Sequence, residues 1–387
     1  MKKNATVILR MEKMAQGGDA ISHLEDGRIC FVAGALSGEL AEVVLTQNKK
    51  DYAKGFAQKI LESSAERVTP ACPLYGKCGG CSLEHASFAF QLEMYRSAVE
   101  ELFRRFAKTE LPAGWKIHSG NPYGYRNRAR LVRAGNGYGF RENQSHRIIP
   151  ISHCKILSPA LNRFLADGKF PKDEEISLFD NGKGKVSYFY KGMRESEFQK
   201  FAQNTVQIND VKISMDSACF FQSNLEVLPE LVNAVVESAG SGNYLIDLFS
   251  GVGFFASILQ KNFKRIVTVE REEKALVHAN QNVPSAKNIS SPAEEWLLQN
   301  DASGADVLIV DPPRTGLPPS ALDAIVQAKP KKLLYISCDP ATLARDFRKF
   351  SESGFSIVRA EGFAFYPQTP HFEMFLELCA KSNLEIL

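Results

Sequence analysis

Apolar residues follow a regular pattern in the last third of the chain. From about residue 242, short apolar runs alternate with amphipathic stretches, and the runs are YLIDLF, RIVTVE, DVLIVD, KLLYIS, FSIVRAEGF and FEMFLEL. Buried strands separated by helices are typical of a doubly wound, mainly parallel sheet with helices on both faces. The pattern therefore predicts an α/β domain at 241–387.

The first third of the chain has a different pattern, in which β-rich runs are separated by glycine-containing turns. The runs are Ala5–Arg10, Arg28–Phe31, Leu40–Leu45 and Gly55–Ile60. They predict a small antiparallel β-barrel at 1–64. Residues 65–240 mix a helix at 86–106 with strand-like segments, which indicates a central α+β domain between the other two.

Composition narrows the class of protein. The chain has 387 residues, 44% of them hydrophobic, and a net charge of +3, which fits a globular protein of two or three domains and permits an RNA partner without requiring one. No apolar run approaches the roughly 20 residues of a membrane helix, and the start of the chain lacks a signal-peptide pattern. We expect a cytoplasmic protein. No feature indicates an obligate protein partner.

A glycine-containing loop follows the first strand of the α/β domain. Gly251 and Gly253 allow a sharp turn into a helix from Phe254, and Glu270 ends the next strand, where a carboxylate can bind both hydroxyls of a ribose. The third glycine of the dinucleotide fingerprint is absent, which favours S-adenosylmethionine over NAD. A tight turn with no ligand is the alternative.

Two further strands of this domain end in reactive residues. Cys338 follows KLLYIS and precedes a helix at 342–350, whose N-terminus should favour the thiolate. Asp311 ends DVLIVD and is held at the same sheet edge by Pro312 and Pro313. The DPPR motif alone indicates amine methylation, whereas the cysteine favours methylation of carbon. A buried structural cysteine and a plain turn are the alternatives.

Methylation at carbon 5 of uracil needs a nucleophile and a base. A thiolate that adds to carbon 6 makes carbon 5 nucleophilic, and a base must then remove the carbon 5 proton so that the thiol can leave. Cys338 is the candidate nucleophile. Glu373, in the otherwise apolar strand FEMFLEL, is the candidate base, because burial should raise its proton affinity. An exposed strand glutamate is the alternative.

A cysteine cluster precedes these motifs. Cys72, Cys78 and Cys81 are separated by five and two residues in a turn-rich segment, and Cys154 is a distant fourth candidate. Thiolates so spaced can bind an iron–sulfur cluster, while structural zinc, with His85 or His153 as mixed ligands, is the rival interpretation.

Basic side chains lie between Cys81 and Cys154, and an aromatic segment follows ahead of the α/β domain. Strand alternation would place Arg126, Arg128 and Arg130 on one face, where they would suit RNA phosphates, and Phe220 lies ahead of the first strand of the α/β domain. A solvated basic strand, and a core position for Phe220, are the alternatives.

Taken together, these motifs resemble the RNA uracil-5 methyltransferase family, in particular its bacterial 23S rRNA branch. The resemblance covers nearly the whole chain and rests on C-x5-C-x2-C with Cys154, YRNRARL, FFQSN, DLFSGVGFF, VDPPRTGL, SCDPATLARDF and HFEMF. It implies an N-terminal TRAM barrel, a [4Fe-4S] cluster and a Rossmann-like class I methyltransferase domain. It also implies that RNA is the partner, with 23S rRNA favoured over tRNA.

The resemblance also assigns roles to particular residues. It implies that Cys338 is the nucleophile and Glu373 the base, and that Arg130 and Phe220 hold a flipped-out uracil. The implied cofactor contacts are Gln222, Phe249, Glu270 and Asp311, in addition to the loop glycine Gly251.

The sequence departs from the family pattern at three positions. Phe254 stands where Asn is frequent, Ser250 where Cys is frequent, and Asp339 where Asn usually follows the nucleophile. None of these changes removes a chemical role. A tRNA uracil-5 methyltransferase, an amine or adenine methyltransferase that uses DPPR, and an RNA-binding iron–sulfur regulator are the alternative functions.

Overall fold

The computed structural model describes residues 5–143, 145–168, 171 and 174–380. The chain forms two compact units. One comprises residues 1–101, 140–149 and 366–371, and the other comprises residues 102–139, 150–365 and 372–387. Among the described residues, no helix combines the length and the apolar character needed to span a membrane.

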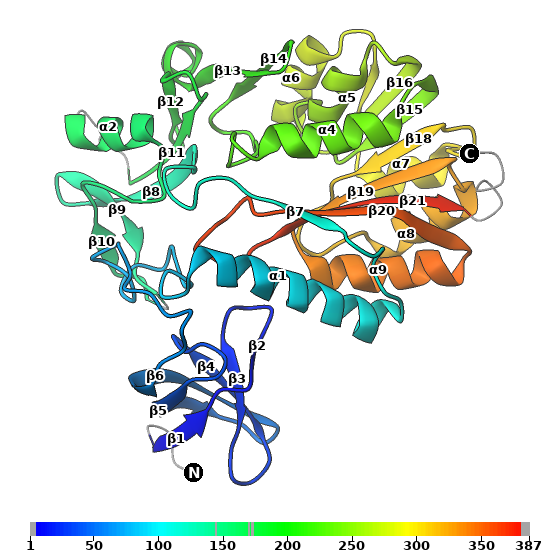
Figure 1. Cartoon of the computed structure of the whole chain (residues 1–387). Helices are drawn as coiled ribbons and strands as arrows, with labels where there is room; N and C mark the ends of the chain where they lie inside the picture. Colours follow the sequence, from blue (N-terminus) through cyan, green and yellow to red (C-terminus); the bar gives the residue numbers. More distant parts are fainter. Residues whose placement is uncertain (1–4, 144, 169–170, 172–173, 381–387) are drawn as a thin grey trace. The chain divides into compact units, whose positions relative to one another are not determined.

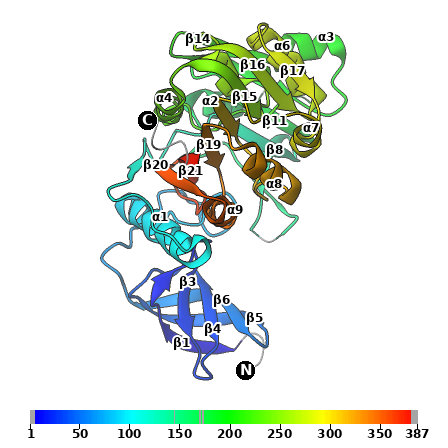
Figure 2. The same ribbon diagram turned by 90° about the vertical axis from the view of Figure 1, so that its right-hand side faces the viewer.

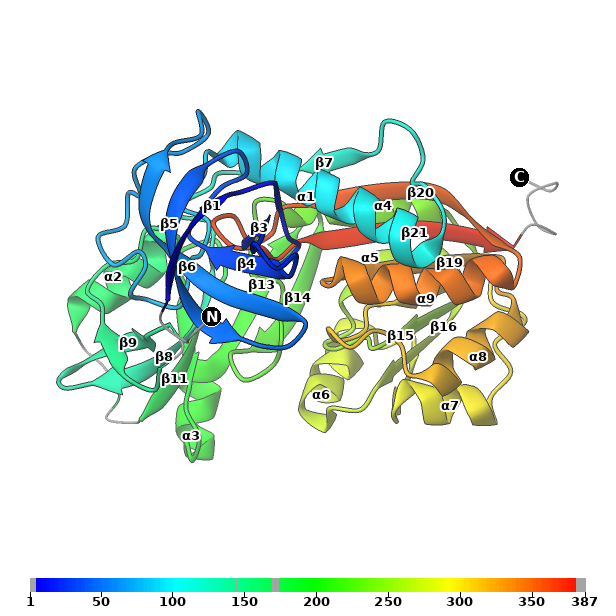
Figure 3. The same ribbon diagram turned by 90° about the horizontal axis from the view of Figure 1, so that it is seen from below.

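The first unit contains a curled six-stranded sheet (Figure 3). Its strands, in the spatial order β1-β5-β6-β4-β3-β2, are β1 (Thr6–Arg10), β5 (Leu40–Asn48), β6 (Tyr52–Glu62), β4 (Ile29–Ala33), β3 (Ala20–His23) and β2 (Lys13–Met14). Alternate residues of β5, including Ala41, Val43 and Leu45, face a core that also holds Met11 and Val32. The period-two alternation in the sequence therefore corresponds to one buried face, as expected for a small barrel.

The second unit is built on an eight-stranded sheet (Figure 1). Its order is β17 (Lys287–Ser290), β16 (Phe263–Glu270), β15 (Gly242–Leu248), β18 (Val307–Val310), β19 (Lys332–Ser337), β21 (Glu373–Ala380), β20 (Phe355–Phe363) and β7 (Lys116–His118). Strands β17, β16, β15, β18 and β19 run parallel to one another. Strand β21 is antiparallel to both of its neighbours, β19 and β20. The predicted α/β fold class is confirmed.

Helices cover both faces of this sheet (Figure 2). On one face lie α4 (Leu228–Ala239), α5 (Phe254–Leu259) and α6 (Glu273–Asn282), and α5 contacts the other two. On the other face lie α7 (Ala293–Gln299), α8 (Pro319–Ala328) and α9 (Pro340–Glu352), and α8 contacts the other two. Because both faces are covered, every residue of β18 and β21 is buried. A charged residue in these strands is therefore removed from water.

Two smaller sheets precede the large one along the chain. The first has the order β10 (Ile148–Pro150), β9 (Gly137–Arg141), β8 (Arg128–Ala134), β11 (Glu175–Asp180), β12 (Val186–Phe189), and the second is the hairpin of β13 (Gln203–Ile208) and β14 (Val211–Asp216). The remaining helices are α1 (Phe88–Leu102), which continues into a π-helix at Phe103–Ala107, α2 (Pro159–Asp167), α3 (Glu195–Glu197) and a second π-helix at Phe198–Ala202.

Candidate active site

The loop after β15 turns sharply because three of its residues have left-handed backbone angles. The φ angles of Phe249, Gly251 and Gly253 are 59°, 54° and 75°. Glycine adopts such angles readily, whereas a bulky aromatic residue rarely does. A side chain at Gly253 would also be crowded, since an added Cβ would lie 3.1 Å from the Cγ2 atom of Val283. Strained backbone of this kind is concentrated at ligand sites.

Glu270, at the end of β16, lies beside this loop. Its Oε2 atom accepts a hydrogen bond from the Gly251 N–H at 2.9 Å, and its Oε1 atom accepts one from the Glu272 N–H at 2.8 Å. The carboxylate is therefore at the position that the sequence predicts, and it also orders the loop backbone.

The FFQSN segment holds its residues in contrasting environments. The Phe220 side chain is 64% exposed, whereas Gln222 is only 5% exposed. Within the described part of the chain, the Gln222 amide makes no hydrogen bond to another residue, so it is available to a ligand. Asn224 is different, because its amide donates to the Phe365 carbonyl at 3.3 Å and its Oδ1 accepts the Val227 N–H at 3.3 Å in the turn before α4.

Core packing explains why Phe254 stands where the family pattern frequently has Asn. The Phe254 ring centroid lies 5.4 Å from that of Phe221 and 4.9 Å from that of Phe255, in edge-to-face geometry. Such pairs stabilise a core beyond the area that they bury. Phe254 therefore joins an aromatic cluster, a role that a polar side chain would not fill.

The candidate nucleophile and base meet at one edge of the large sheet. Asp311 and Cys338 directly follow the neighbouring parallel strands β18 and β19. Glu373 is the first residue of β21, which runs antiparallel to β19 with Ser337 opposite Met374. Two strand ends and one strand start therefore bring these three side chains to the same edge, and the charges of Asp311 and Glu373 both raise the pKa of Cys338.

Burial raises the proton affinity of the carboxylates in this region. It raises the pKa of Asp311 to about 7 and, with the charge of Asp311, raises the pKa of Glu373 well above its ordinary value. Burial, followed by the charges of Asp311 and Glu270, raises the pKa of Asp247 to about 8. Several buried acids with shifted pKa values are typical of a functional site. They also favour a positively charged ligand.

The expectation that Cys338 is a stabilised thiolate is wrong. Burial, and then the charges of Glu373 and Asp311, raise the pKa of Cys338 to about 12, and Arg314 offsets only part of this effect. The start of α9 does not compensate, because the Asp339 carboxylate caps this end of the helix by accepting the N–H groups of residues 341 and 342, each at 3.0 Å. Asp339, one of the three departures from the family pattern, thus occupies the helix N–H groups that were expected to stabilise a thiolate at Cys338.

The three arginines predicted to bind RNA are engaged within the protein. Arg130 pairs with Glu175, and Arg126 donates to the Arg128 carbonyl at 3.0 Å. Arg128 donates to the backbone carbonyl of Cys219, and its guanidinium carbon lies 5.8 Å from the centre of the Phe220 ring. Only Arg128 and Arg130 belong to β8, so the expected alternation holds for two of the three.

Three of the cluster cysteines lie in one turn-rich segment of the first unit. The Cys78 N–H donates to the Leu74 carbonyl at 2.9 Å, and the Cys72 N–H donates to the Glu84 carboxylate at 2.9 Å. A Cβ at Gly80 would lie 3.5 Å from the Cys78 sulfur, so glycine leaves space beside this thiol. All eight cysteines are thiols and these three are half-buried, which suits coordination of a cluster.

Cys154 belongs to the second unit, where Asn162 of α2 fixes its backbone. The Asn162 amide accepts the Cys154 N–H at 2.9 Å and donates to the Cys154 carbonyl at 3.0 Å. Of the histidines considered as zinc ligands, His85 is buried and hydrogen-bonded to the Tyr75 hydroxyl at 2.5 Å. His153 is exposed and lines an open groove of about 580 Å³ with Tyr123.

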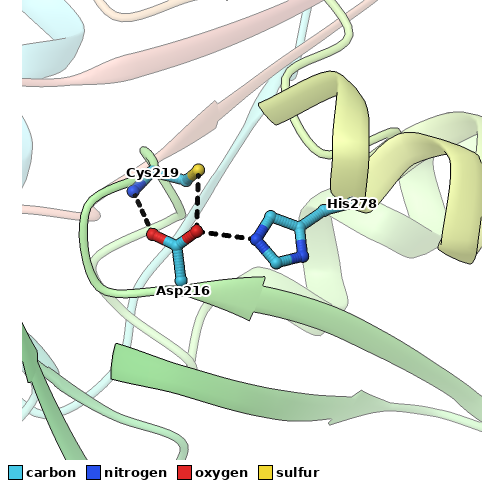
Figure 4. Close-up of side chains that lie close together, drawn as sticks. All are labelled: Asp216, Cys219 and His278. Atoms are coloured by element: carbon cyan, nitrogen blue, oxygen red, sulfur yellow. Dashed lines mark hydrogen bonds and ion pairs between the residues drawn. The ribbon is translucent and has the colours of Figure 1, made fainter. Parts of the chain in front are cut away.

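Several residues of functional interest were not predicted from the sequence. Asp247 could have been predicted from the sequence, since it is the one charged residue of the apolar strand YLIDLF. Arg314 could also have been predicted, since it ends the DPPR motif. Figure 4 shows a buried group that had no local signal, formed by Asp216, Cys219 and His278. Their candidate metal-binding atoms lie within 4.8 Å of one another, although Asp216 and His278 are 62 residues apart.

The arrangement defines a class of protein. A glycine turn after the first strand, an acid after the second and reactive groups at the same sheet edge are the features of a Rossmann-like methyltransferase. Comparison with known proteins agrees. Residues 299–381 match the family described as tRNA (uracil-5-)-methyltransferase. The tRNA (uracil-54, C5)-methyltransferase of Pyrococcus abyssi, solved with S-adenosyl-L-homocysteine, has the same fold, with a TM-score of 0.73 and 23% identity over 96% of this chain and 100% of that chain.

Full-length relatives define the family. The chain is 30% identical to the 23S rRNA (uracil(1939)-C(5))-methyltransferase RlmD of Shewanella amazonensis, across 96% of this chain and 95% of that protein. It is also 30% identical to a Treponema denticola protein described as an uncharacterized RNA methyltransferase, across 95% of this chain and 97% of that protein. The chain belongs to the RNA uracil-5 methyltransferase family, and it is an enzyme that uses S-adenosylmethionine.

Proposed function

We propose that this enzyme methylates carbon 5 of a specific uridine in 23S rRNA, with Cys338 as the nucleophile and Glu373 as the general base. The proposal rests on the observation that the Cys338 thiol and the buried carboxylates of Asp311 and Glu373 lie at the same edge of the sheet. A methyltransferase acting on an amine through DPPR alone would not need a cysteine at this place. The full-length likeness to a 23S rRNA enzyme favours rRNA over tRNA.

The proposed cofactor contacts are Gln222, Phe249, Gly251, Glu270 and Asp311. The cofactor supplies an activated methyl group on a positively charged sulfur. Gln222 offers a buried amide with no partner among the described residues, and Glu270 already lies against the loop. The buried acid Asp311 favours the positive charge over a neutral ligand. These features fit S-adenosylmethionine better than an uncharged nucleoside.

The protein residues then act on the uracil in a fixed order. Loss of the Cys338 proton to solvent is unfavourable, because the pKa of the thiol is about 12, and Arg314 is the nearby cation that favours it. The sulfur bonds to carbon 6, and the electron pair of the ring double bond moves toward the carbon 4 carbonyl. After carbon 5 is methylated, Glu373 removes the carbon 5 proton, the double bond re-forms and the carbon–sulfur bond breaks. The base must be the ionised form of Glu373, and its raised proton affinity makes that form a stronger proton acceptor in this last step.

The mechanism can be tested with RNA in which 5-fluorouridine replaces uridine. Fluorine cannot leave as a proton, so the enzyme should remain covalently attached to the RNA after denaturation. The complex should require S-adenosylmethionine and should be lost in Cys338→Ala. Normal 5-methyluridine formation by that variant would overturn the proposed mechanism. Transcripts of 23S rRNA and of tRNA, compared by nucleoside analysis, would decide between the two RNA substrates.

The proposed RNA contacts are Arg126, Arg128, Arg130 and Phe220. Phe220 is the exposed aromatic ring of this group, and the Arg128 guanidinium lies over it, an arrangement that suits stacking against an unpaired base. Phe220→Ala should weaken binding of the substrate RNA, whereas binding of S-adenosylhomocysteine in the absence of RNA should not change. Equal loss of both affinities would assign Phe220 to the fold.

We further propose that Cys72, Cys78, Cys81 and Cys154 bind one [4Fe-4S] cluster and that the curled sheet of the first unit is a TRAM barrel that contacts RNA. Methyl transfer needs no electron, so the cluster would order the RNA-binding region. The glycine space beside Cys78 and the fixed backbone of Cys154 support coordination. Protein purified without oxygen should be brown and contain about four irons per chain. A colourless protein with one zinc would contradict the cluster.

A further inference from the structure

Helix α6 presents two buried polar side chains, His278 and Asn282, which are one turn apart and therefore lie on the same face. This face contacts both the loop after β15 and the strand β14, which leads to Phe220. The exposed fractions of His278 and Asn282 are 3% and 8%, so water cannot replace their hydrogen bonds. Their partners therefore determine what α6 holds in place.

Asn282 links the cofactor loop to β14. Its Nδ2 atom donates to the Val252 carbonyl at 2.8 Å and to the Ser214 carbonyl at 2.9 Å. Its Oδ1 atom accepts the Ser214 N–H at 2.8 Å. Val252 lies between the two loop glycines that have left-handed angles. One amide side chain thus binds the backbone of the loop and the backbone of the strand at the same time.

His278 fixes the turn that follows β14. Its Nε2 atom is 2.7 Å from Oδ2 of Asp216, the last residue of that strand (Figure 4). The other oxygen of Asp216 accepts the N–H groups of Ala218 and Cys219 at 2.7 and 3.0 Å. The turn therefore has a defined shape up to the residue before Phe220.

The geometry of the buried group is that of hydrogen bonding. Two ligands of one tetrahedral zinc ion lie roughly 3.3 Å apart, given metal–ligand bonds of about 2.0 Å. The His278 and Asp216 atoms are closer than this, at 2.7 Å. The Cys219 sulfur lies 3.5 Å from the same carboxylate oxygen, within range of a weak S–H hydrogen bond. Asp216 is thus already satisfied by four donors.

We infer that His278 and Asn282 are positioning residues that couple the cofactor loop to the segment carrying Phe220. Through α6, a change in the loop on cofactor binding is passed to the turn at 216–219 and to the exposed ring beyond it. The inference rests on the proposed function, since it takes Phe220 to hold the target base. It predicts that cofactor and RNA each bind more tightly when the other is present, by the same factor.

The experiment measures this factor directly. Dissociation constants are determined for S-adenosylhomocysteine with and without a 23S rRNA fragment, and for the fragment with and without S-adenosylhomocysteine. The fragment is one that the wild-type protein methylates, so a failure of the proposed function appears first and separately. We expect the wild type to show about fivefold coupling or more, and Asn282→Ala to reduce the factor to near one. Asn280→Ala, an exposed amide on the same helix, is the matched control.

A second pair of variants guards against simple loss of stability. His278→Leu removes the bond to Asp216 and should also reduce the coupling factor, whereas His278→Gln keeps an N–H donor and should restore much of it. A general structural role would weaken each affinity but leave the ratio unchanged. The inference is overturned if the wild type shows no coupling, or if folded Asn282→Ala or His278→Leu keeps the wild-type factor.

Discussion

Replacing Asp311 with Asn should make the Cys338 thiol more reactive at moderate pH, although the substitution removes a proposed cofactor contact. The pKa of Asp311 is about 7, so its carboxylate is charged above neutral pH and repels a thiolate at Cys338. Asparagine has nearly the same shape without the charge. The substitution therefore isolates one of the causes that raise the pKa of Cys338.

The size of the effect follows from the pKa values. With a pKa of about 12, only about one Cys338 thiol in ten thousand is ionised near pH 8. Asp311 is the third cause of the raised pKa, after burial and the charge of Glu373, so removing its charge should lower the pKa by on the order of 1 unit. One unit gives about ten times more thiolate, which is about three times less nucleophilic, so reaction should be roughly three times faster.

The assay follows alkylation of Cys338 by iodoacetamide, with the labelled peptide quantified by mass spectrometry. In the wild type the rate should rise about tenfold per pH unit, from about pH 7 to about pH 10, without levelling off. In Asp311→Asn the curve should level off at lower pH, and the exposed Asp301→Asn should match the wild type. A wild-type plateau near the ordinary thiol pKa of about 8.5 would refute the reasoning. So would unchanged curves in Asp311→Asn.

Three other substitutions test separate parts of the site and the fold. Glu373→Gln should permit methyl transfer but slow proton removal, so that covalent protein–RNA complexes accumulate with natural uridine on denaturing gels; wild-type turnover would assign the base elsewhere. Gly253→Ala should lower the free energy of unfolding by about 1–2 kcal/mol, because its φ is 75°, and should weaken S-adenosylhomocysteine binding in calorimetry. Gly304→Ala, which has open space at Cβ, should change neither quantity. Asp346→Asn should cost on the order of 3 kcal/mol in urea unfolding, because this carboxylate is buried and hydrogen-bonded. The exposed Asp323→Asn should cost less than about 1 kcal/mol, and equal losses would contradict the difference assigned to burial.

Much of the large sheet could be predicted because its signals are local. The apolar strands before Asp311 and Cys338 are bounded by turns and helices, and the doubly wound pattern fixes the edge at which they end. The glycine loop was predictable for the same reason. The three-residue strand β7 was not, because so short a segment has no period, and only its pairing with β20 makes it part of the sheet.

The electrostatic properties of the site depend on contacts that no local pattern records. The high pKa of Cys338 comes from burial and from Glu373, which is 35 positions away in the chain and reaches the same edge through the reversed strand β21. The hydrogen bond between His278 and Asp216 likewise joins an α-helix to a hairpin. Such features follow from the tertiary fold, so spacing and propensity do not predict them.

Because β21 runs antiparallel to β19, we expect the nucleophile and the base to differ in mobility. Parallel strands reach this edge with their last residues, so their reactive groups lie on the turns beyond, as Cys338 does. Strand β21 arrives with its first residue, and Glu373 is still paired with Phe363 of β20. Displacing the Glu373 backbone would break its pairing with β20, whereas a turn can adjust without loss of strand pairing. We therefore expect slow amide hydrogen exchange at Met374 and faster exchange around Cys338. The uracil and the sulfur would then move toward a stationary proton acceptor.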